Sequence, residues 1–355
     1  MQPTPMHDTR ANSGEAPLLS VEDLQVHFDD VAGTVRAVDG ASFQVAPGRT
    51  LGIVGESGCG KSVTARAILR IEDRRSRIVG GRILLRTPAG VRDLVQLQPN
   101  CRAMRQIRGQ QIGLVFQEPM TSFSPVHTIG SQITEALQAH GSIDRAEAER
   151  RAVEQLKAVG APHPQLIMSQ YAWQLSGGLR QRAMIAMALM CDPALLIADE
   201  PTTALDVTTQ AQVLELLRTL QRQRQMGLIL ITHDLGVIAE TADDVVIMYL
   251  GRVVERGPVA AIFRDPQHPY TQALLRSMPN VTAQPRTRLS TVRGAVPHPL
   301  RRPQGCPFHT RCPSAMPGVC DRIEPPAIAV SSDHVVSCHL HAAAHVAAAA
   351  LATGA

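Results

Sequence analysis

The sequence Gly-Glu-Ser-Gly-Cys-Gly-Lys-Ser at residues 55–62 constrains the fold of this chain more than any other feature. It matches the pattern GxxxxGK[ST], in which a loop wraps the phosphates of a nucleotide. An apolar run at 51–54 precedes it, and a helix-like run at 63–69 follows it. Glycines let backbone N–H groups approach phosphate oxygens, and the start of the helix adds a positive dipole end. The sequence therefore predicts an α/β fold that binds nucleotide at this loop.

Two side chains of this loop have expected chemical roles. Lys61 is expected to reach the β- and γ-phosphates, and Ser62 is expected to bind Mg²⁺. The chain has 35 Lys and Arg residues, but only Lys61 and Lys157 are lysines. A lysine stands at the position where a compact point charge suits phosphate. The expected phosphate contacts are Gly55, Glu56, Ser57, Gly58, Cys59, Gly60, Lys61, Ser62 and Val63.

Composition narrows the class of protein. The chain has 355 residues and is 44% hydrophobic, so it can bury a sizeable core. Its net charge of +4 is weak and no dense basic run is present, so a nucleic-acid partner is not expected. No stretch approaches the roughly 20 apolar residues of a membrane span. Residues 1–17 lack the apolar segment of a signal peptide, which predicts a cytosolic protein with a disordered tail over 1–18.

Strand-like and helix-like segments alternate from about residue 19 to 257. This alternation predicts a parallel core sheet with antiparallel strands near its start and an inserted helical subdomain at about 118–191. Residues 258–340 are rich in Pro and Arg and hold four cysteines, which predicts a separate C-terminal extension. The Ala-rich segment 341–355 is expected to fray. The expected strands are 24–28, 41–45, 50–54, 83–86, 112–116, 194–198, 228–232, 245–249 and 251–255.

A second motif consists of the apolar run 195–198 followed by Asp199 and Glu200. A buried parallel strand carries acids at its carboxyl end to the edge of the sheet where ligands bind. Asp199 is expected to hold Mg²⁺. Glu200 is expected to orient and polarise the water that attacks the phosphate.

A second helix start also suits an anion. The sequence Leu-Ser-Gly-Gly-Leu-Arg-Gln at 175–181 opens a helix expected over 179–190. Because one phosphate loop needs no second helix start for its own nucleotide, we expect this one to cap a nucleotide held by another subunit. The residues expected to act there are Ser176, Gly177, Gly178 and Gln181.

In order and spacing these motifs resemble those of the ABC ATPases, and the resemblance implies four further roles. Gln117 resembles the Q-loop glutamine, which contacts Mg²⁺ or water and faces the membrane partner. His233 resembles the switch histidine that touches the γ-phosphate. Asp206 resembles the D-loop aspartate at the dimer seam. Phe28 is expected to stack on adenine, although an aromatic residue in a strand can also belong to the core.

Four further stretches resemble the ATPase subunits of bacterial oligopeptide and dipeptide importers: 116–122, 198–208, 268–275 and 305–313. This narrower resemblance covers about residues 19–340. It implies a P-loop ATPase of ABC type with a mixed core sheet, an antiparallel β subdomain, an inserted helical subdomain and a Cys-bearing extension. It also implies ATP and Mg²⁺ as ligands.

The same resemblance implies partners and a location. Two transmembrane permease subunits, a second ATPase subunit that is usually a paralogue, and indirectly an extracytoplasmic peptide-binding protein would complete the importer. The chain would sit at the cytoplasmic face of the inner membrane. It departs from the family pattern at Glu118, at Phe123-Ser124 and at Ala172-Trp173, of which the last two lie where the membrane partner docks.

Two alternatives remain open at this point. The same machine could import nickel, glutathione or another small solute. A soluble ABC protein that acts in translation or chromosome maintenance is less favoured, since such proteins usually carry two ATPase modules or long coiled coils, and this chain shows neither.

Four C-terminal cysteines need their own explanation, because disulfides are rare in the cytosol. Cys306, Cys312, Cys320 and Cys338 lack the tight CxxC spacing of zinc knuckles. Four thiolates suit an iron–sulfur cluster or zinc, and free thiols remain possible. The family resemblance implies a [4Fe–4S] cluster. In a Zn²⁺ site the flanking His309 and His339 could replace a thiolate.

Overall fold

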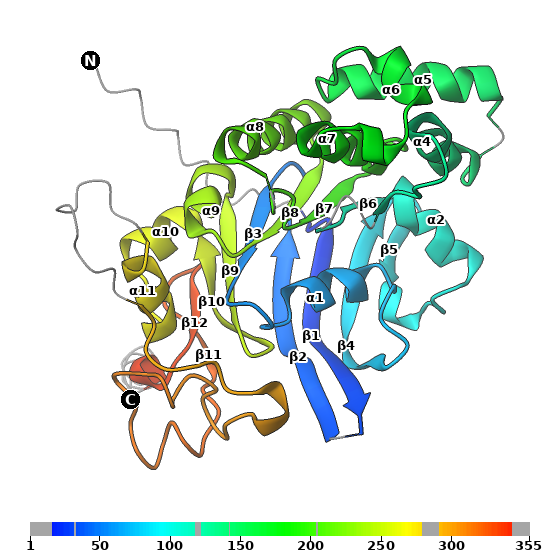
Figure 1. Cartoon of the computed structure of the whole chain (residues 1–355). Coiled ribbons are helices and arrows are strands. Elements are labelled where there is room, and N and C mark those ends of the chain that lie inside the picture. The colour runs from blue at the N-terminus through cyan, green and yellow to red at the C-terminus, as the bar shows by residue number, and fades with distance from the viewer. Residues whose placement is uncertain are drawn as a thin grey trace, which may run out of the picture.

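The computed structural model describes residues 16–31, 33–117, 122–141, 143–203, 205–278 and 291–342. Its main sheet has the strand order β11-β12-β10-β9-β3-β8-β7-β6 (Figure 1). Strands β9, β3, β8, β7 and β6 are parallel, and β10, β12 and β11 run antiparallel to their neighbours. The bounds are β3 (Thr50–Val54), β6 (Ile112–Val115), β7 (Leu195–Asp199), β8 (Gly227–Thr232), β9 (Asp244–Tyr249), β10 (Arg252–Pro258), β11 (Ala327–Ala329) and β12 (Val335–Ser337).

The central strands are largely apolar because both faces of this sheet are covered. Every residue of β3, β7 and β8 is buried. In β7, Leu195 and Ile197 pack into one hydrophobic cluster, whereas Leu196 and Ala198 pack into the other. This alternation follows from the two-residue period of a strand. The mixed core sheet predicted from the sequence is confirmed.

A second sheet is antiparallel, with the order β2-β1-β4-β5. Three of its strands contain the predicted segments, while β5 was not predicted. Leu18 is buried, and its N–H donates to the Val45 carbonyl at 2.8 Å, so the chain is already packed at the boundary expected for the tail. Residues 1–15 lie outside the described ranges. The bounds are β1 (Leu19–Asp30), β2 (Gly33–Val45), β4 (Ser76–Thr87) and β5 (Gly90–Asp93).

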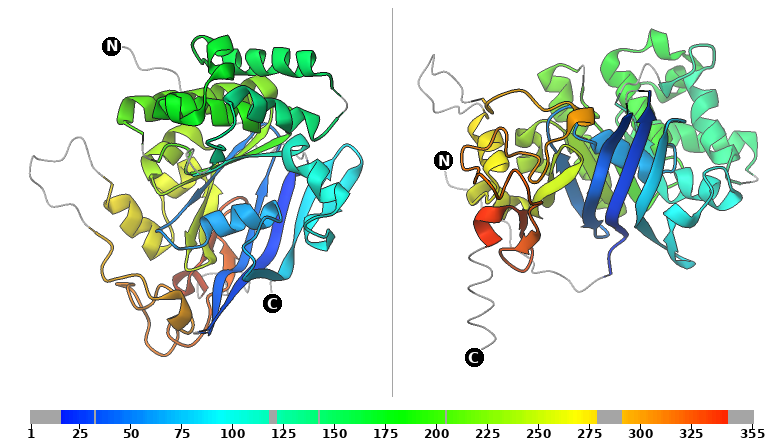
Figure 2. Two further views of the ribbon diagram at one scale, coloured as in Figure 1. Left: turned by 45° about the vertical axis from the view of Figure 1, so that its right-hand side comes forward. Right: turned by 90° about the horizontal axis from the view of Figure 1, so that it is seen from below.

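Helices α4 to α7 gather at one end of the molecule, opposite the C-terminal extension (Figures 1 and 2). From 122 to 191 the described residues contain no strand, in agreement with the predicted helical subdomain. The α-helices are α1 (Lys61–Ile68), α2 (Arg102–Gln110), α4 (Ile129–Gln138), α5 (Arg145–Ala158), α6 (Pro164–Ser169), α7 (Gly177–Ala188), α8 (Val207–Arg224), α9 (Leu235–Thr241), α10 (Val259–Arg264) and α11 (Pro269–Arg276). Short 3₁₀ turns are η1 (Leu94–Gln96), η2 (Ala172–Gln174), η3 (Pro299–Arg301) and η4 (His339–His341).

Local signals set the start of several helices. Asp144 caps α5, since its carboxylate accepts the Glu147 N–H at 2.8 Å. Helix α7 begins at Gly177, two residues earlier than expected, because Ser176 is its cap. Among the described helices, none has the length and apolar character needed to cross a bilayer.

The C-terminal extension is not a separate body, which corrects the prediction from its composition. Strand β12 pairs with β10, so that Val336 lies opposite Glu255, and β11 pairs with β12. The extension therefore lengthens the core sheet at its β10 edge. Phe308, which is 1% exposed, anchors it by packing on the rings of Tyr249 and Tyr270.

Candidate functional site

The phosphate loop lies between β3 and α1, and neighbouring backbone leaves two of its three glycines no room for a side chain. A Cβ on Gly55 would stand 2.2 Å from the Met248 carbonyl oxygen in β9. Gly60 has φ +102°, and a Cβ there would stand 2.3 Å from the carbonyl oxygen of Ala37 in β2. These contacts explain why the loop needs glycine at both positions. Ser57 and Gly58 face solvent, whereas Cys59 is 3% exposed.

Lys61 and Ser62 begin helix α1 directly below the loop. Lys61 is 5% exposed, and its Nζ donates to the carbonyl oxygens of Gly55 and Glu56 at 2.7 and 3.2 Å. Ser62 Oγ donates to Asp199 Oδ1 at 3.0 Å. Burial raises the pKa of Asp199, although the Ser62 hydrogen bond opposes the rise. A hydroxyl and a carboxylate oxygen at this spacing are donors that suit Mg²⁺.

Glu200 is the centre of a polar cluster at the carboxyl ends of three neighbouring parallel strands. Its Oε2 accepts from Gln117 Nε2 at 3.1 Å and from Thr203 Oγ1 at 3.0 Å. Its Oε1 lies 3.5 Å from Nδ1 of His233. Gln117 follows β6, Glu200 follows β7 and His233 follows β8. The structure therefore brings together all three residues that the sequence predicted to be catalytic.

The backbone of Glu200 has an unusual conformation. Its φ is +46°, in the left-handed region that a non-glycine residue rarely adopts. The Glu200 N–H donates to the Ile231 carbonyl at 2.9 Å, which ties this turn to β8. The carboxylate is thereby turned toward His233, whose side chain is 68% exposed, while the Glu200 side chain is 15% exposed.

The residues predicted to act on another subunit's nucleotide lie on one exposed surface. Ser176 caps α7, and Asp206 caps α8. A Cβ on Gly178 would stand 2.8 Å from Thr209 Cγ2, so the two helix starts are in contact. Ser176, Gly177 and Asp206 are exposed. These positions are open to a partner.

Gln181 does not share this exposure. It is 1% exposed and its Nε2 has no hydrogen-bond partner. Its side chain points into the molecule because it falls on the buried side of α7. The expectation that Gln181 contacts a nucleotide on a partner is therefore not supported.

Two other expectations concern residues farther from this cluster. Phe28 lies in β1 opposite Val35 of β2 and Ser76 of β4 and is partly buried. Its role in adenine stacking stays a prediction. Val63 is the third residue of α1 and is also partly buried.

The four C-terminal thiols gather in the extension and are all free. Burial raises the pKa of Cys306 to about 11, and the neighbouring Cys338, Cys320 and Cys312 add to the rise. Within the described ranges, no group of three or more His, Cys, Asp or Glu side chains is arranged to hold a metal ion. The structure thus brings the predicted cysteines into one region without closing them round a metal.

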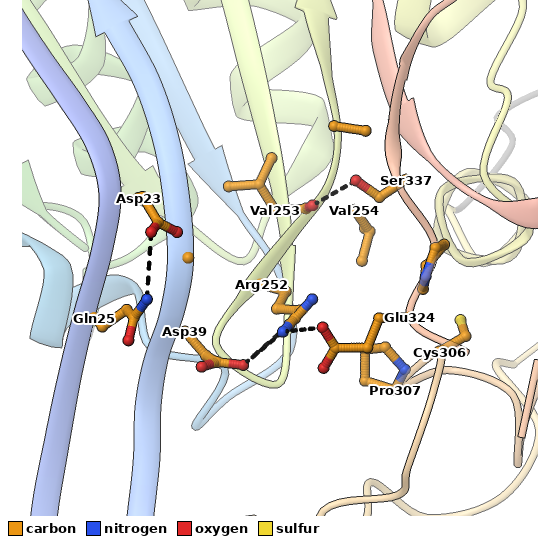
Figure 3. Close-up of a pocket in the computed structure, with 13 residues that line it drawn as sticks. Asp23, Gln25, Asp39, Arg252, Val253, Val254, Cys306, Pro307, Glu324 and Ser337 are labelled. Atoms are coloured by element: carbon orange, nitrogen blue, oxygen red, sulfur yellow. Dashed lines mark hydrogen bonds and ion pairs between the residues drawn. The ribbon is translucent and has the colours of Figure 1, made fainter. Parts of the chain in front are cut away.

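A cavity of about 300 Å³ lies beside Cys306, between the extension and the antiparallel sheet (Figure 3). Arg252 crosses it and pairs with both Asp39 and Glu324, at 2.9 and 2.7 Å. Arg302 also pairs with Asp39, at 2.6 Å. The phosphate loop does not line this cavity, whose charged residues join the extension to β2 and β10.

Sequence reasoning missed two residues that shape the site. Thr203 holds the Glu200 carboxylate by a hydrogen bond. It lies three residues after Glu200 in the same sequence motif, and this position could have indicated the contact. The Tyr270 hydroxyl accepts the backbone N–H of Glu56 at 3.1 Å and so holds the phosphate loop. In the sequence Tyr270 is part of the family stretch 268–275, but sequence alone does not show that it approaches a loop 214 residues away.

Comparison with known proteins shows the family. The ABC transporter family matches residues 38–203, and the family described as "Oligopeptide/dipeptide transporter, C-terminal region" matches residues 254–320. A peptide ABC transporter ATP-binding protein of Sinorhizobium fredii is 48% identical over 323 residues, which cover 90% of this chain and 94% of that protein. This chain belongs to the ATP-binding subunits of ABC peptide transporters.

Other relatives of this ABC ATPase belong to the same class of protein. Dipeptide transport ATP-binding proteins of Haemophilus influenzae and Bacillus subtilis are 48% and 47% identical, and each alignment covers 91% of this chain and 95% or 94% of the relative. A solved bacterial ABC transporter cassette, 24% identical, covers 68% of this chain and 98% of that one with a TM-score of 0.60. A Clostridium perfringens subunit of an ABC transporter complex, 26% identical, covers 71% of this chain and 92% of its own with a TM-score of 0.58. The predicted fold and the ATPase class are confirmed.

Proposed function

We propose that this ATPase powers the import of short peptides and hydrolyses ATP at the cluster around Lys61 and Glu200. The main support for the proposal is that Gln117, Glu200 and His233 lie together, next to the hydrogen-bonded pair of Ser62 and Asp199. The peptide cargo is supported by the match over residues 254–320 and by the named relatives. Purified subunit should bind ATP, and a Lys61→Ala variant should lose this binding; unchanged binding in that variant would contradict the site.

The mechanism follows from the placement of the side chains. The loop backbone and Lys61 bind the β- and γ-phosphates. Ser62 and Asp199 would hold Mg²⁺, which would supply positive charge beside the phosphate oxygens. Glu200 takes the proton of the attacking water, because Gln117 and Thr203 fix its carboxylate by hydrogen bonds. Catalysis then rests on positioning and on electrostatic stabilisation.

A complete site requires a second ATPase subunit, either a copy of this chain or a paralogue. The exposed Ser176, Gly177 and Asp206 supply the surface that would cap the partner's nucleotide. Mixing a Lys61→Ala subunit with a Ser176→Arg subunit tests this for paired copies. Each variant alone has no intact site, but the mixed pair keeps one, so activity should return on mixing. Full activity of Ser176→Arg alone would contradict the proposal.

We also propose that two transmembrane subunits dock on the helical region at the cytoplasmic face of the membrane. Val126, Leu166 and Trp173 are 74%, 57% and 60% exposed there, and exposed apolar side chains mark interaction surfaces. Detergent-purified complex should contain the two membrane proteins, and Trp173→Asp should reduce their recovery without reducing ATP binding. Equal recovery would place the docking surface elsewhere.

Cargo identity is tested on that complex with its external binding protein. Stimulation of ATP hydrolysis by dipeptides or oligopeptides, with no response to nickel or glutathione, is expected. A response to nickel or glutathione alone would favour the alternative cargo.

For the extension we propose a [4Fe–4S] cluster on Cys306, Cys312, Cys320 and Cys338. Four gathered, unpaired thiols fit this donor set. Zinc on the same thiolates is the alternative, since four thiolates also suit a Zn²⁺ site. Anaerobically purified protein should be brown, and Cys312→Ser should remove the colour. Colourless protein with stoichiometric zinc would reverse the assignment.

A further inference from the structure

The C-terminal extension contributes a charged side chain to the phosphate loop itself. Arg311 donates from both terminal nitrogens to the Glu56 carboxylate, at 2.6 and 3.0 Å. Its side chain is 4% exposed, whereas that of Glu56 is 25% exposed. A bidentate pair of this kind combines charge with a fixed orientation. Glu56 is the second residue of the loop, and Arg311 lies 255 residues away in sequence.

Several contacts hold the guanidinium of Arg311 in place. Its Nε donates to the Arg293 carbonyl at 2.9 Å, and one terminal nitrogen donates to the Tyr249 hydroxyl at 3.3 Å. The group lies 5.7 Å from the ring centre of Tyr249 and 5.9 Å from that of Phe308. Packing and hydrogen bonds therefore leave this arginine one orientation, and that orientation faces Glu56.

The charge of Glu56 explains why such an arrangement matters. A free carboxylate in a loop that must receive a triphosphate would repel it, since like charges disfavour each other's approach. Arg311 offsets that charge, while Tyr270 holds the Glu56 backbone. The hydrogen bonds to Glu56 also raise the pKa of Arg311, so it stays charged.

We propose that Arg311 is a positioning residue for nucleotide binding: it neutralises Glu56 and turns its carboxylate away from the phosphates. The inference rests on the proposed nucleotide site at this loop. It makes the extension part of that site, although every ATP motif lies before residue 258.

A double-mutant cycle tests the proposal with the full-length chain. Binding of adenylyl imidodiphosphate and of ADP is measured for the native chain, Arg311→Met, Glu56→Gln and the double variant. In the native background, Arg311→Met should weaken binding of the triphosphate analogue by about tenfold, and that of ADP by less. In the Glu56→Gln background, Arg311→Met should weaken binding less than threefold, because residue 56 then has no negative charge that could repel the nucleotide.

The outcomes separate an electrostatic role from a structural one. Equal losses in both backgrounds, or equal losses for the two nucleotides, would mean that Arg311 acts only by supporting the fold, and would overturn the proposal. Arg311→Lys keeps the charge and should fall between the native chain and Arg311→Met. The matched control is Arg301→Gln, an exposed arginine of the same extension, which should bind as the native chain does.

One further control keeps the two proposals distinct. If Lys61→Ala abolishes binding while Arg311→Met has no effect, the nucleotide site stands and the inference about Arg311 fails. If Lys61→Ala has no effect, the proposed nucleotide site itself fails.

Discussion

Replacing Glu255 by glutamine should loosen the junction between the core sheet and the extension. Glu255 lies in β10, is fully buried and accepts three hydrogen bonds. Oε1 accepts from the Gln267 N–H at 2.7 Å and lies 2.7 Å from Nε2 of His334, and Oε2 accepts from the His268 N–H at 3.0 Å. One carboxylate thus joins β10, the start of α11 and the chain before β12.

The magnitude follows from what an amide can replace. In Glu255→Gln, the amide oxygen can take the place of Oε1, but the NH₂ group then faces the His268 N–H, and two donors meet. The variant loses one charge-assisted bond and weakens two others, and an unsatisfied buried donor alone costs about 1–3 kcal/mol. We expect a loss of about 2–4 kcal/mol in local stability, which is roughly 30- to 10³-fold in the opening equilibrium.

Amide hydrogen exchange read by mass spectrometry measures this opening directly. Peptides that contain Gln267 and His268 and those that contain β12 should exchange faster by about that factor, while peptides from α5 should not change. The matched control is Glu324→Gln, since that side chain is 54% exposed and its pair with Arg252 should contribute less than about 1 kcal/mol. A change below about fivefold at Gln267 and His268 would refute the reasoning.

The same variant has a predicted pH dependence. Burial alone would raise the pKa of Glu255, but hydrogen bonds from His334, Gln267 and His268 outweigh it, so the pKa lies below its usual range. A depressed carboxyl pKa stabilises the fold fully above the unfolded value of about 4.3, and the contribution is lost as pH falls through the folded value. The difference between the native chain and Glu255→Gln should therefore be constant near neutrality and shrink below about pH 4.3. A difference that grows on acidification would show that the sign is wrong.

Three further predictions concern the nucleotide site. Glu200→Gln should keep nucleotide binding, trap a closed ATPase pair and lower ATP turnover by roughly 10²-fold or more, whereas near-normal turnover would reject Glu200 as the base. Burial raises the pKa of Asp199, so Mg²⁺ affinity should start to fall on acidification at a higher pH than for an ordinary aspartate. Measuring Mg²⁺-dependent ATP turnover as a function of pH checks this. A loss of turnover that begins only below about pH 4 would contradict it. Gly60→Ala should weaken nucleotide binding more than Gly58→Ala, since a Cβ on Gly60 meets the Ala37 carbonyl and one on Gly58 meets nothing within 4 Å; equal losses in a direct binding assay would show that only the positive φ matters.

Much of this site could be predicted from sequence because parallel strands impose it. Each predicted catalytic residue lies within two residues of the end of a mostly apolar strand, and the carboxyl ends of neighbouring parallel strands share one edge of a sheet. Glu200 could be predicted from the strand that precedes it, whereas the roles of Gln117 and His233 were implied by the resemblance to the ABC ATPases. The structure adds that β6, β7 and β8 are neighbours, which brings the three residues together.

The parts that sequence did not predict depend on long-range packing. Gln181 was grouped with its neighbours in the motif, but one residue along a helix turns a side chain by about 100°, and this one points inward. The extension was expected to be separate because Pro, Arg and Cys dominate it, yet the short runs at β11 and β12 complete the core sheet. Strands of three residues carry too little periodicity to be recognised.

The extension also reaches the phosphate loop indirectly, through Arg302 and β2. Arg252 and Arg302 hold Asp39 of β2, and burial, which alone would raise the pKa of Asp39, is outweighed by these arginines, so the pKa is lowered. The Asp39 N–H donates to the Gly251 carbonyl at 2.8 Å, and the Gly251 N–H donates to the Cys59 carbonyl at 2.9 Å. A hydrogen-bonded path therefore runs from the extension through β2 to the phosphate loop.

This path and the Arg311–Glu56 pair reach the loop independently. The path fixes the backbone at Cys59, and the pair fixes the side chain of Glu56. Both residues belong to the phosphate loop. A chain that ended at Gly257 would keep every ATP motif and the backbone bonds from Asp39 to Cys59, but Asp39 would lose Arg302 and Glu56 would lose Arg311. Both parts of the chain thus contact the phosphate loop, and the extension packs into the core sheet through the β10–β12 pairing.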